Sequence, residues 1–236
     1  MEITLNKVFV GLPKTIGSKE AANPMDREWT SAIFKEPVDE AIWVGKTGLT
    51  GDGQGDLKHH GGPEKAVFAY SLENYSYWQK ELGNSEIGAG GMGENLVMEG
   101  LDEGAISIGD TFQIGEAVIQ VSQPRQPCWK PARRFKVKNL ALLLQNTGKT
   151  GWYFRVVEEG NVESGQTFTL LDRPFPQWTI KRCNQIIHAK PLDFSEMREL
   201  AQCQLLAPGM RETLAKRIEK QNSSPDIRDR VFGPNE

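Results

Sequence analysis

Alternating hydrophobic and polar positions mark the larger, N-terminal part of the chain. In the clearest run, residues 106–122, Phe112 and Ile114 alternate with polar residues, Gly115 and Glu116 stand where a two-residue turn fits, and the alternation then resumes. A period of two is typical of strands that bury one face, so this run predicts a hairpin. Five other segments carry strand signals: residues 41–44, 66–70, 94–98, 152–157 and 166–171. Strands at such regular spacing predict a barrel or sandwich.

Two stretches within this region are predicted to be short helices. Apolar residues recur at intervals of three and four from Leu72 to Leu82, where Ser71 can cap the start and Gly83 can end the helix. Leucines gather in residues 139–145, which predicts a second helix between strands. We expect the apolar stripe of the first helix to pack against the strands.

The hydrophobic period changes from two to about 3.6 after residues 174–176. Three short helices are predicted there: one around Cys183, one introduced by Asp193 with Glu196 three residues later, and one after Pro208. A segment of this size is too small for a core of its own. Its apolar face is therefore expected to dock on the barrel or on another subunit, and the second arrangement would make a homodimer.

These patterns divide the chain into three parts. We expect a β-barrel domain at residues 1–175, a three-helix segment at residues 176–222 and a mobile tail at residues 223–236, which has no hydrophobic period. The predicted fold is mainly β, with short helices interspersed among the strands.

The charge balance restricts the partners of the protein. The chain has 236 residues, and 28 Lys+Arg against 31 Asp+Glu give a net charge of −3 at pH 7, which excludes a strongly basic nucleic-acid binder. No segment approaches the about 20 consecutive apolar residues that a membrane span needs, and the first residues lack the layout of a signal peptide. We therefore expect a cytoplasmic protein that binds neither nucleic-acid polymers nor membranes.

Cysteines and histidines are few. Cys128, Cys183 and Cys203 never occur as C-x-x-C, which gives little support to a disulfide framework or a structural zinc site. His59 and His60 are adjacent, and neighbours in an extended segment face opposite sides. The sequence therefore argues against a histidine-rich metal site, and any cysteine chemistry belongs to a single thiol.

Three runs that resemble loops carry most of the candidate chemistry: residues 51–63, 90–96 and 123–134. The first begins with glycines that lack the spacing of a dinucleotide fingerprint and fit a flexible turn. It continues with Lys58, His59, His60 and Gly61, whose side chains and amides can bind an anion such as phosphate. The alternative for the two histidines is a hydrogen-bonded, half-buried pair.

The second run carries Glu94, which is either a general base or the cap of a turn. The third run contains Cys128, with Arg125, Lys130 and Arg133 close in sequence and prolines that are expected to keep the segment out of regular structure. Nearby cations favour a thiolate. Cys128 is therefore a candidate nucleophile, redox thiol or soft-metal ligand, whereas Cys183 and Cys203 fall at apolar helical positions.

Taken together and in this order, the three runs resemble the MOSC family, in particular its YiiM-type branch. The match begins around residues 29–35, includes the sequence Gly-Trp-Tyr-Phe-Arg at residues 151–155, and extends into the helical tail, which is similar to the three-helix segment of that branch. Its most specific element is Arg125-x-Pro127-Cys128. The resemblance implies a MOSC-type β-barrel with short helices, followed by a small three-helix C-terminal segment.

The resemblance also implies molybdenum cofactor chemistry. Cys128 would be a catalytic residue that ligates molybdenum beside the pterin dithiolene of molybdopterin, and a soft thiolate suits that metal. Glu94 is the only carboxylate nominated to supply protons. The residues expected to bind the cofactor, with its phosphate, are Lys58, His59, His60, Gly61, Asn95, Arg125, Gln126, Arg133, Trp152, Tyr153 and Arg155.

By the same resemblance the protein would be a reductase of small N-hydroxylated compounds, such as N-hydroxylaminopurines, that cleaves the N–O bond. No flavin or iron–sulfur motif is evident, so a separate reductase is expected to supply electrons. Three alternatives stay open. The chain is a carrier of the cofactor or of its sulfur, with Cys128 as persulfide or ligand; a hydrolase with a dyad of Cys128 and His59 or His60; or a binding module whose basic loops form an anion patch.

Overall fold

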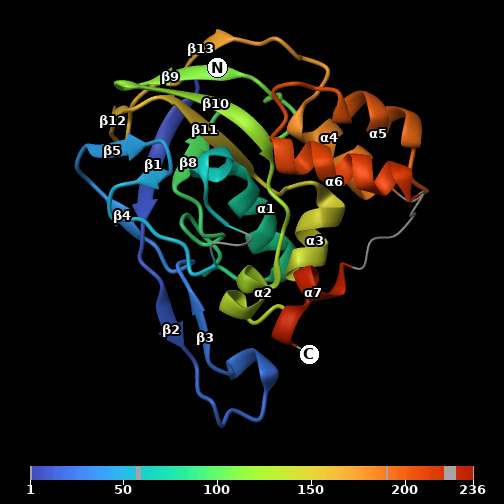
Figure 1. Cartoon of the computed structure of the whole chain (residues 1–236). Coiled ribbons are helices and arrows are strands. Elements are labelled where there is room, and N and C mark those ends of the chain that lie inside the picture. Colours follow the sequence, from blue (N-terminus) through green and yellow to red (C-terminus); the bar gives the residue numbers. More distant parts are fainter. Residues whose placement is uncertain (1, 57–59, 190, 221–226, 236) are drawn as a thin grey trace.

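A curled eight-stranded sheet forms most of the computed structural model, which describes residues 2–56, 60–189, 191–220 and 227–235 (Figure 1). Its neighbouring strands are antiparallel except for one parallel pair, β7 and β8. The spatial order is β13 (Thr169–Asp172), β9 (Thr111–Ile114), β10 (Ala117–Pro124), β11 (Trp152–Glu158), β7 (Val67–Ser71), β8 (Leu96–Glu99), β1 (Thr4–Val10) and β4 (Glu36–Val38).

The sheet curls until the segment before β13 meets the start of β1. The Leu5 amide donates to the Gln166 carbonyl at 2.8 Å, and the Phe168 amide donates to the Ile3 carbonyl at 2.8 Å. These bonds join β1 to the opposite end of the sheet order, so the expected MOSC-type barrel is confirmed. A three-stranded sheet of β12 (Gly160–Val162), β5 (Ile42–Gly45) and β6 (Gly48–Leu49) lies beside it.

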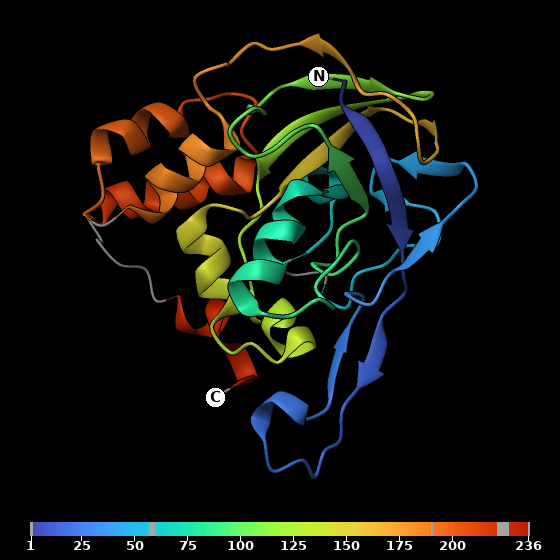
Figure 2. The ribbon, with the colours of Figure 1, turned by 180° about the vertical axis from the view of Figure 1, so that it is seen from behind.

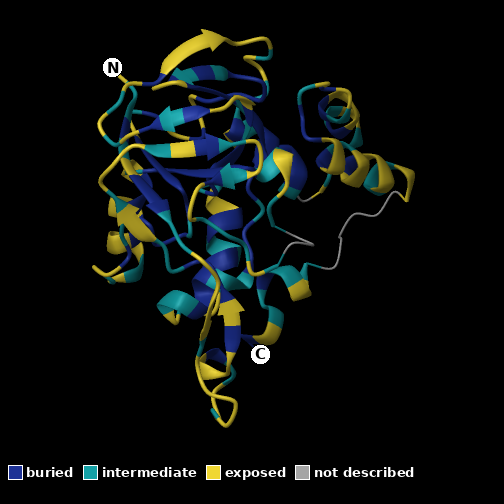
Figure 3. Ribbon diagram, turned by 60° about the vertical axis from the view of Figure 1, so that its left-hand side comes forward, coloured by how far each residue is buried: buried dark blue, intermediate teal, exposed yellow. Residues whose placement is uncertain are grey.

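A hairpin projects from the body of the molecule. It consists of β2 (Lys14–Ile16) and β3 (Trp29–Ser31), with a 3-10 turn at Pro24–Asp26 between them. Figure 1 shows it at the bottom, away from the barrel, and Figure 3 shows that exposed residues are frequent along it.

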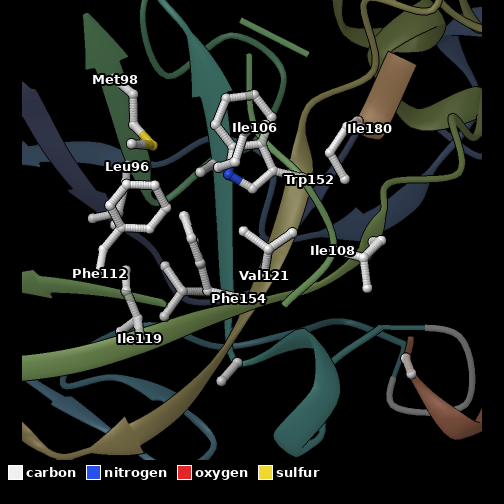
Figure 4. Packing of buried hydrophobic residues seen from close by; sticks show 14 of the residues in the cluster. Leu96, Met98, Ile106, Ile108, Phe112, Ile119, Val121, Trp152, Phe154 and Ile180 are labelled. Atoms are coloured by element: carbon white, nitrogen blue, oxygen red, sulfur yellow. The ribbon is translucent and has the colours of Figure 1, made fainter. Parts of the chain in front are cut away.

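The barrel encloses an apolar core, part of which is drawn in Figure 4. Phe112 and Phe154 meet edge to face, with ring centroids 6.3 Å apart and an interplanar angle of 88°. Burying a large apolar side chain stabilises the fold by about 1.5–3 kcal/mol. The period-two pattern of β9 and β10 thus places its apolar residues inside, and this hairpin is confirmed with Ala117 opposite Ile114.

Three helices of the C-terminal segment close one end of this core. They are α4 (Ile180–His188), α5 (Phe194–Ala201) and α6 (Pro208–Glu219). Cys183, Met197 and Leu214 are buried in the same cluster as barrel residues. The Asp193 carboxylate caps α5 by accepting from the Ser195 and Glu196 amides. The predicted helices are confirmed, and the segment docks on the barrel.

Helices α1 (Glu73–Leu82), α2 (Trp129–Phe135) and α3 (Leu140–Thr147) gather on another side of the barrel (Figure 2). They share a second apolar cluster that includes Trp78 and Leu140. The predicted end of α1 at Gly83, in the left-handed region with φ 59°, is confirmed. The predicted cap is wrong, because the Ser71 hydroxyl donates to the Glu73 carboxylate at 2.6 Å and caps no backbone amide.

Some predicted boundaries move. Strands at residues 41–44, 66–70, 94–98 and 152–157 correspond to β5, β7, β8 and β11. The strand predicted at residues 166–171 begins only at Thr169, because the residues before it pair with β1. The helix predicted at residues 139–145 is α3.

One prediction of irregular structure is wrong. Helix α2 starts directly after Cys128, with Pro131 in its first turn, where a missing N–H leaves no helical hydrogen bond unmade. Within the tail at residues 223–236, which has no hydrophobic period, residues 227–235 form α7 (Arg228–Val231) and a 3-10 turn (Gly233–Asn235), and residues 223–226 and 236 lie outside the described residues. We call residues 227–235 the C-terminal arm. Within the described residues, no helix is long and apolar enough to span a membrane.

Candidate functional site

The three runs singled out in the sequence meet at one cleft, which we call the first cleft. Its walls come from strands and loops that are far apart in the chain. Among the lining residues are Lys35, Asp52, Gly53, Gln54, His60, Gly61, Lys65, Phe68, Gly93, Asn95, Arg125, Cys128, Lys130 and Tyr153.

Cys128 lies at the junction between a strand and a helix. Strand β10 ends at Pro124, the Arg125 amide donates to the Gly151 carbonyl at 3.1 Å, and Cys128 then takes an extended conformation immediately before α2. Its residue surface is 9% exposed, and it lines the first cleft. The fold therefore presents one thiol to the cleft, while Cys183 and Cys203 are buried in the apolar core.

Arg125 is the buried cation of this cleft. It is 5% exposed, its guanidinium carbon lies 4.9 Å from the centroid of the Phe68 ring, and its Nη1 has no hydrogen-bond partner among the described residues. Burying a charge without partners costs several kcal/mol, so such a group normally faces an anion or a polar ligand. The unpartnered nitrogen indicates that the first cleft is built to hold one.

Tyr153 and His60 are held neutral beside this cation. Burial raises the pKa of Tyr153 to about 12, and the charge and hydrogen bond of Arg125 act against that rise. Burial also lowers the pKa of His60 to about 3, and the charges of Lys130, Arg125 and Lys65 lower it further. At neutral pH both side chains therefore offer hydrogen bonds without carrying charge.

Gly61 has a local reason to be glycine. Its φ is +84°, and a Cβ there would meet the Gln54 side chain at 2.8 Å. Lys58 and His59, which were expected to bind the cofactor phosphate, lie outside the described residues.

A buried network that the sequence did not reveal stiffens the cleft. The Asp52 carboxylate accepts from Lys35 Nζ, from the Gly11 amide at 2.9 Å and from Asn95 Nδ2 at 2.9 Å. Asn95 Oδ1 accepts from the Phe68 amide at 3.1 Å. Asn95 thus lines the cleft as expected, but its side chain joins strand β7 to the loop of Asp52.

Burial lowers the pKa of Lys35, and the charge of Asp52 counteracts this. Lys35 ends the stretch where the family resemblance begins, and Asp52 lies 17 positions later, inside the first glycine run. These two positions were the only indication of the ion pair in the sequence.

Glu94 has a structural role and lines neither cleft, contrary to its nomination as a pocket acid. It is fully buried, and its carboxylate accepts from the Tyr75 hydroxyl, from the Gly90 amide at 2.7 Å and from the Met92 amide at 3.0 Å. Burial raises the pKa of Glu94, and these hydrogen bonds act against the rise. The carboxylate therefore fixes the turn at residues 90–93.

Three of the residues expected to bind the cofactor lie away from the first cleft. Arg133 donates to Asn235 Oδ1 at 2.7 Å and thereby holds the C-terminal arm. Arg155 forms an ion pair with Glu64 at 2.5 Å. Trp152 is fully buried in the barrel core. Position along the chain did not distinguish them from Arg125, because the groups that surround them come from distant segments.

Gln126 lines a second, larger cleft that adjoins the first. The two clefts share five lining residues: His60, Lys65, Cys128, Lys130 and Tyr153. We call this the second cleft. Its remaining lining comes from Asp56, from Gln123 of β10, from the start of α2, from α6 and from the C-terminal arm. Cys128 therefore stands on the border between two spaces of different composition.

Comparison with known proteins places this geometry in a family. The MOSC domain family matches residues 56–169, and the YiiM-like 3-alpha helix domain family matches residues 178–221. The chain is 37% identical to Protein YiiM of Escherichia coli over 201 residues, which cover 84% of this chain and 88% of that protein. It is 35% identical over 178 residues to a protein of Gibberella moniliformis named "Reductase", covering 74% of this chain and 32% of that protein.

A solved structure shows the same fold over nearly the whole chain. The crystal structure of YiiM from Geobacillus stearothermophilus has a TM-score of 0.76 and 34% sequence identity, and the match covers 92% of this chain and 99% of that chain. The barrel, the docked three-helix segment and the extent of these matches together show that the chain belongs to the MOSC family, in its YiiM-type branch.

Proposed function

We propose that this protein is a molybdenum-cofactor-dependent oxidoreductase that reduces N-hydroxylated compounds by cleaving their N–O bond, with Cys128 as the protein ligand of molybdenum. One observation carries the proposal: a single thiol and a buried guanidinium with an unpartnered nitrogen border the same cleft. Membership of the MOSC family and the relative named as a reductase support it.

The residues of the first cleft fit the cofactor. A soft thiolate is a suitable ligand for molybdenum. The anionic part of a pterin cofactor needs cations and amide donors. Cys128 would hold the metal, and Arg125 and Lys130 would hold the anionic part. The Lys35–Asp52–Asn95 network would keep the opposite wall rigid, since its carboxylate accepts from three donors.

When bound, the cofactor supplies two-electron oxygen-atom transfer chemistry. The overall reaction takes the hydroxylated nitrogen compound, two electrons and two protons to the amine and water, and a separate reductase would supply the electrons. The chain's own residues bind and orient. Tyr153 keeps its proton at neutral pH and can donate a hydrogen bond, while His60 stays neutral and can donate or accept one.

The test is the metal content of protein purified from cells that make the cofactor. Cys128→Ala should lower bound molybdenum by about tenfold or more, because loss of a metal ligand costs at least as much as loss of its supporting contacts. The matched control is Cys203→Ala, which removes a buried thiol that lines neither cleft and should leave the metal content unchanged. Equal molybdenum in the native chain and in Cys128→Ala would refute the ligand assignment.

Turnover separates the enzyme from a carrier. Loaded protein should reduce an N-hydroxylated base in the presence of a chemical reductant. A fully loaded protein that binds molybdenum through Cys128 but turns over none of these compounds would instead be a carrier of the cofactor.

A further inference from the structure

The C-terminal arm contacts the backbone on both sides of Cys128. The Arg230 guanidinium donates to the Pro127 carbonyl, and Asn235 Nδ2 donates to the Trp129 carbonyl at 3.1 Å. Residues 125–128 form the connection between β10 and α2, and Trp129 is the first residue of α2. Two side chains of one short segment thus hold the two chain neighbours of Cys128.

The two donors are themselves fixed by neighbouring helices. Arg133 of α2 donates to Asn235 Oδ1 at 2.7 Å, and Arg230 donates to Gln145 Oε1 of α3 at 2.6 Å. Figures 1 and 2 show α7 beside these two helices. Asn235 is 3% exposed, so its amide is held in a closely packed environment. The arm is therefore a rigid support and not a loose end of the chain.

Fixed neighbours restrict the direction of the Cys128 thiol. Because peptide units are planar, φ and ψ at Cys128 set the direction in which its side chain leaves the backbone. Cys128 has φ −122° and ψ 171°, which lie in the broad extended region, where φ ranges from about −60° to −160°. Hydrogen bonds to the carbonyls of both neighbours narrow that range. Partners that orient a metal ligand in this way change metal affinity by about 10–100-fold.

We propose that the C-terminal arm positions Cys128 for the metal, with Arg230 and Asn235 as positioning residues that act through the backbone of its neighbours. This inference rests on the proposed function, which makes Cys128 the ligand. Arg230 also lines the second cleft, whereas Asn235 lines neither cleft and reaches the thiol through the backbone. The two family matches cover residues 56–169 and 178–221, so this support comes from a segment outside both.

Asn235→Asp separates the positioning of Cys128 from the docking of the arm. The carboxylate keeps an acceptor for Arg133, so the arm stays attached, but it has no hydrogen to donate to the Trp129 carbonyl. Arg230→Met removes the donor to the Pro127 carbonyl, and Arg230→Lys returns a donor to the same position.

The first two measurements are the molybdenum content and the electron paramagnetic resonance spectrum of loaded, partly reduced protein. Asn235→Asp and Arg230→Met should lower bound molybdenum by about tenfold and change the spectrum of the metal that remains, because the thiolate is no longer held in one orientation. Arg230→Lys should recover most of both. Arg198→Met, at an exposed position of α5, is the control for loss of an arginine and should change neither.

The third measurement is amide hydrogen exchange of protein without cofactor. In the fragments that span residues 125–136, exchange should become about fivefold faster in Asn235→Asp and Arg230→Met, as loss of one hydrogen bond predicts. The midpoint of thermal unfolding should stay within about 4 °C of that of the native chain, which shows that each variant is folded.

The results separate this inference from the proposed function. Native exchange, metal content and spectrum in both variants would overturn the inference, and so would a loss of molybdenum that follows a lower unfolding midpoint and that Arg230→Lys does not repair. Cys128→Ala would still lose its molybdenum in either case. Molybdenum retained by Cys128→Ala would refute the proposed function, even where exchange at residues 125–136 still depends on the arm.

Discussion

Two buried arginines on either side of Cys128 meet opposite surroundings. Arg133, 1% exposed, donates to Asn235 Oδ1 at 2.7 Å and to the carbonyls of Pro24 and Pro234 at 2.8 Å each. Arg125, 5% exposed, keeps an Nη1 without a partner among the described residues. The protein itself supplies the hydrogen-bond acceptors for the Arg133 guanidinium, whereas Nη1 of Arg125 needs an acceptor from outside the protein.

The packing near each arginine follows the same division. The guanidinium of Arg133 lies 5.0 Å from the ring centroid of Trp129, and a Cβ on Gly233 would come within 2.3 Å of that ring. The C-terminal arm is therefore pressed closely against α2. Arg125, by contrast, lines the first cleft. Burial by itself does not identify a functional charge; burial without partners, beside a cleft, does.

Removing Arg133 should have the largest effect on stability. Arg133→Met should lower the free energy of unfolding by about 3 kcal/mol, because several charge-assisted hydrogen bonds are lost and Asn235 is left without its donor. Urea denaturation followed by circular dichroism measures this. Arg198→Met, on the exposed face of α5, is the control and should change stability by less than about 0.5 kcal/mol. If Arg133→Met changed the free energy of unfolding as little as Arg198→Met, the hydrogen bonds of Arg133 would not stabilise the fold, and the comparison with Arg125 would fail.

A substitution of His188 tests whether a buried nitrogen without a hydrogen-bond partner indicates a ligand site even where it lies outside both clefts. Its Nε2 has no partner among the described residues, and burial, followed by the charges of Arg230 and Arg217, lowers its pKa to about 3. In the unfolded chain a histidine has a pKa of about 6.5. Below that pH the unfolded chain takes up a proton that the folded protein refuses, so stability is fully present above pH 6.5 and is lost as the pH falls toward 3.

His188→Gln should therefore reduce the loss of stability between pH 7 and pH 5 by about 1 kcal/mol. This value is smaller than that for a fully buried histidine, because solvent screens the partly exposed His188. Urea titrations at both values of pH measure this difference. Molybdenum content should stay unchanged, because His188 lines neither cleft. An unchanged pH slope in the variant would show that this nitrogen is not kept neutral by the fold.

The sequence predicted the parts of the fold that depend on local periodicity. The hairpin of β9 and β10, helix α1 and the three helices after residue 176 each carry their pattern within one short segment. The parallel pairing of β7 with β8 and the closure of β1 on residues 165–168 join distant segments, so no local pattern encodes them. Helix α7 is only one turn long and gave no period to detect.

The candidate site was predictable to the same extent. Cys128 and Arg125 stand in a distinctive motif, and the structure places both in the first cleft. Arg133 and Arg155 carry the same charge in neighbouring motifs, but only the three-dimensional surroundings show that Asn235 and Glu64 engage them. Lys35 and Asp52 went unnoticed because neither is unusual until the fold pairs them.

Arg125→Met should give the smallest change in stability and the clearest sign of function. An apolar side chain of similar length removes a buried charge that lacks part of its hydrogen bonding, so the free energy of unfolding should change by less than about 1 kcal/mol in either direction. Bound molybdenum should nevertheless fall by about tenfold, because the anionic ligand loses its buried cation. Arg125→Met should therefore lose molybdenum and keep its stability. Arg133→Met should lose stability, although Arg133 lines neither cleft. If Arg125→Met instead destabilised the protein by several kcal/mol and kept its molybdenum, the unpartnered guanidinium would be a structural element, and the distinction between the two arginines would fail.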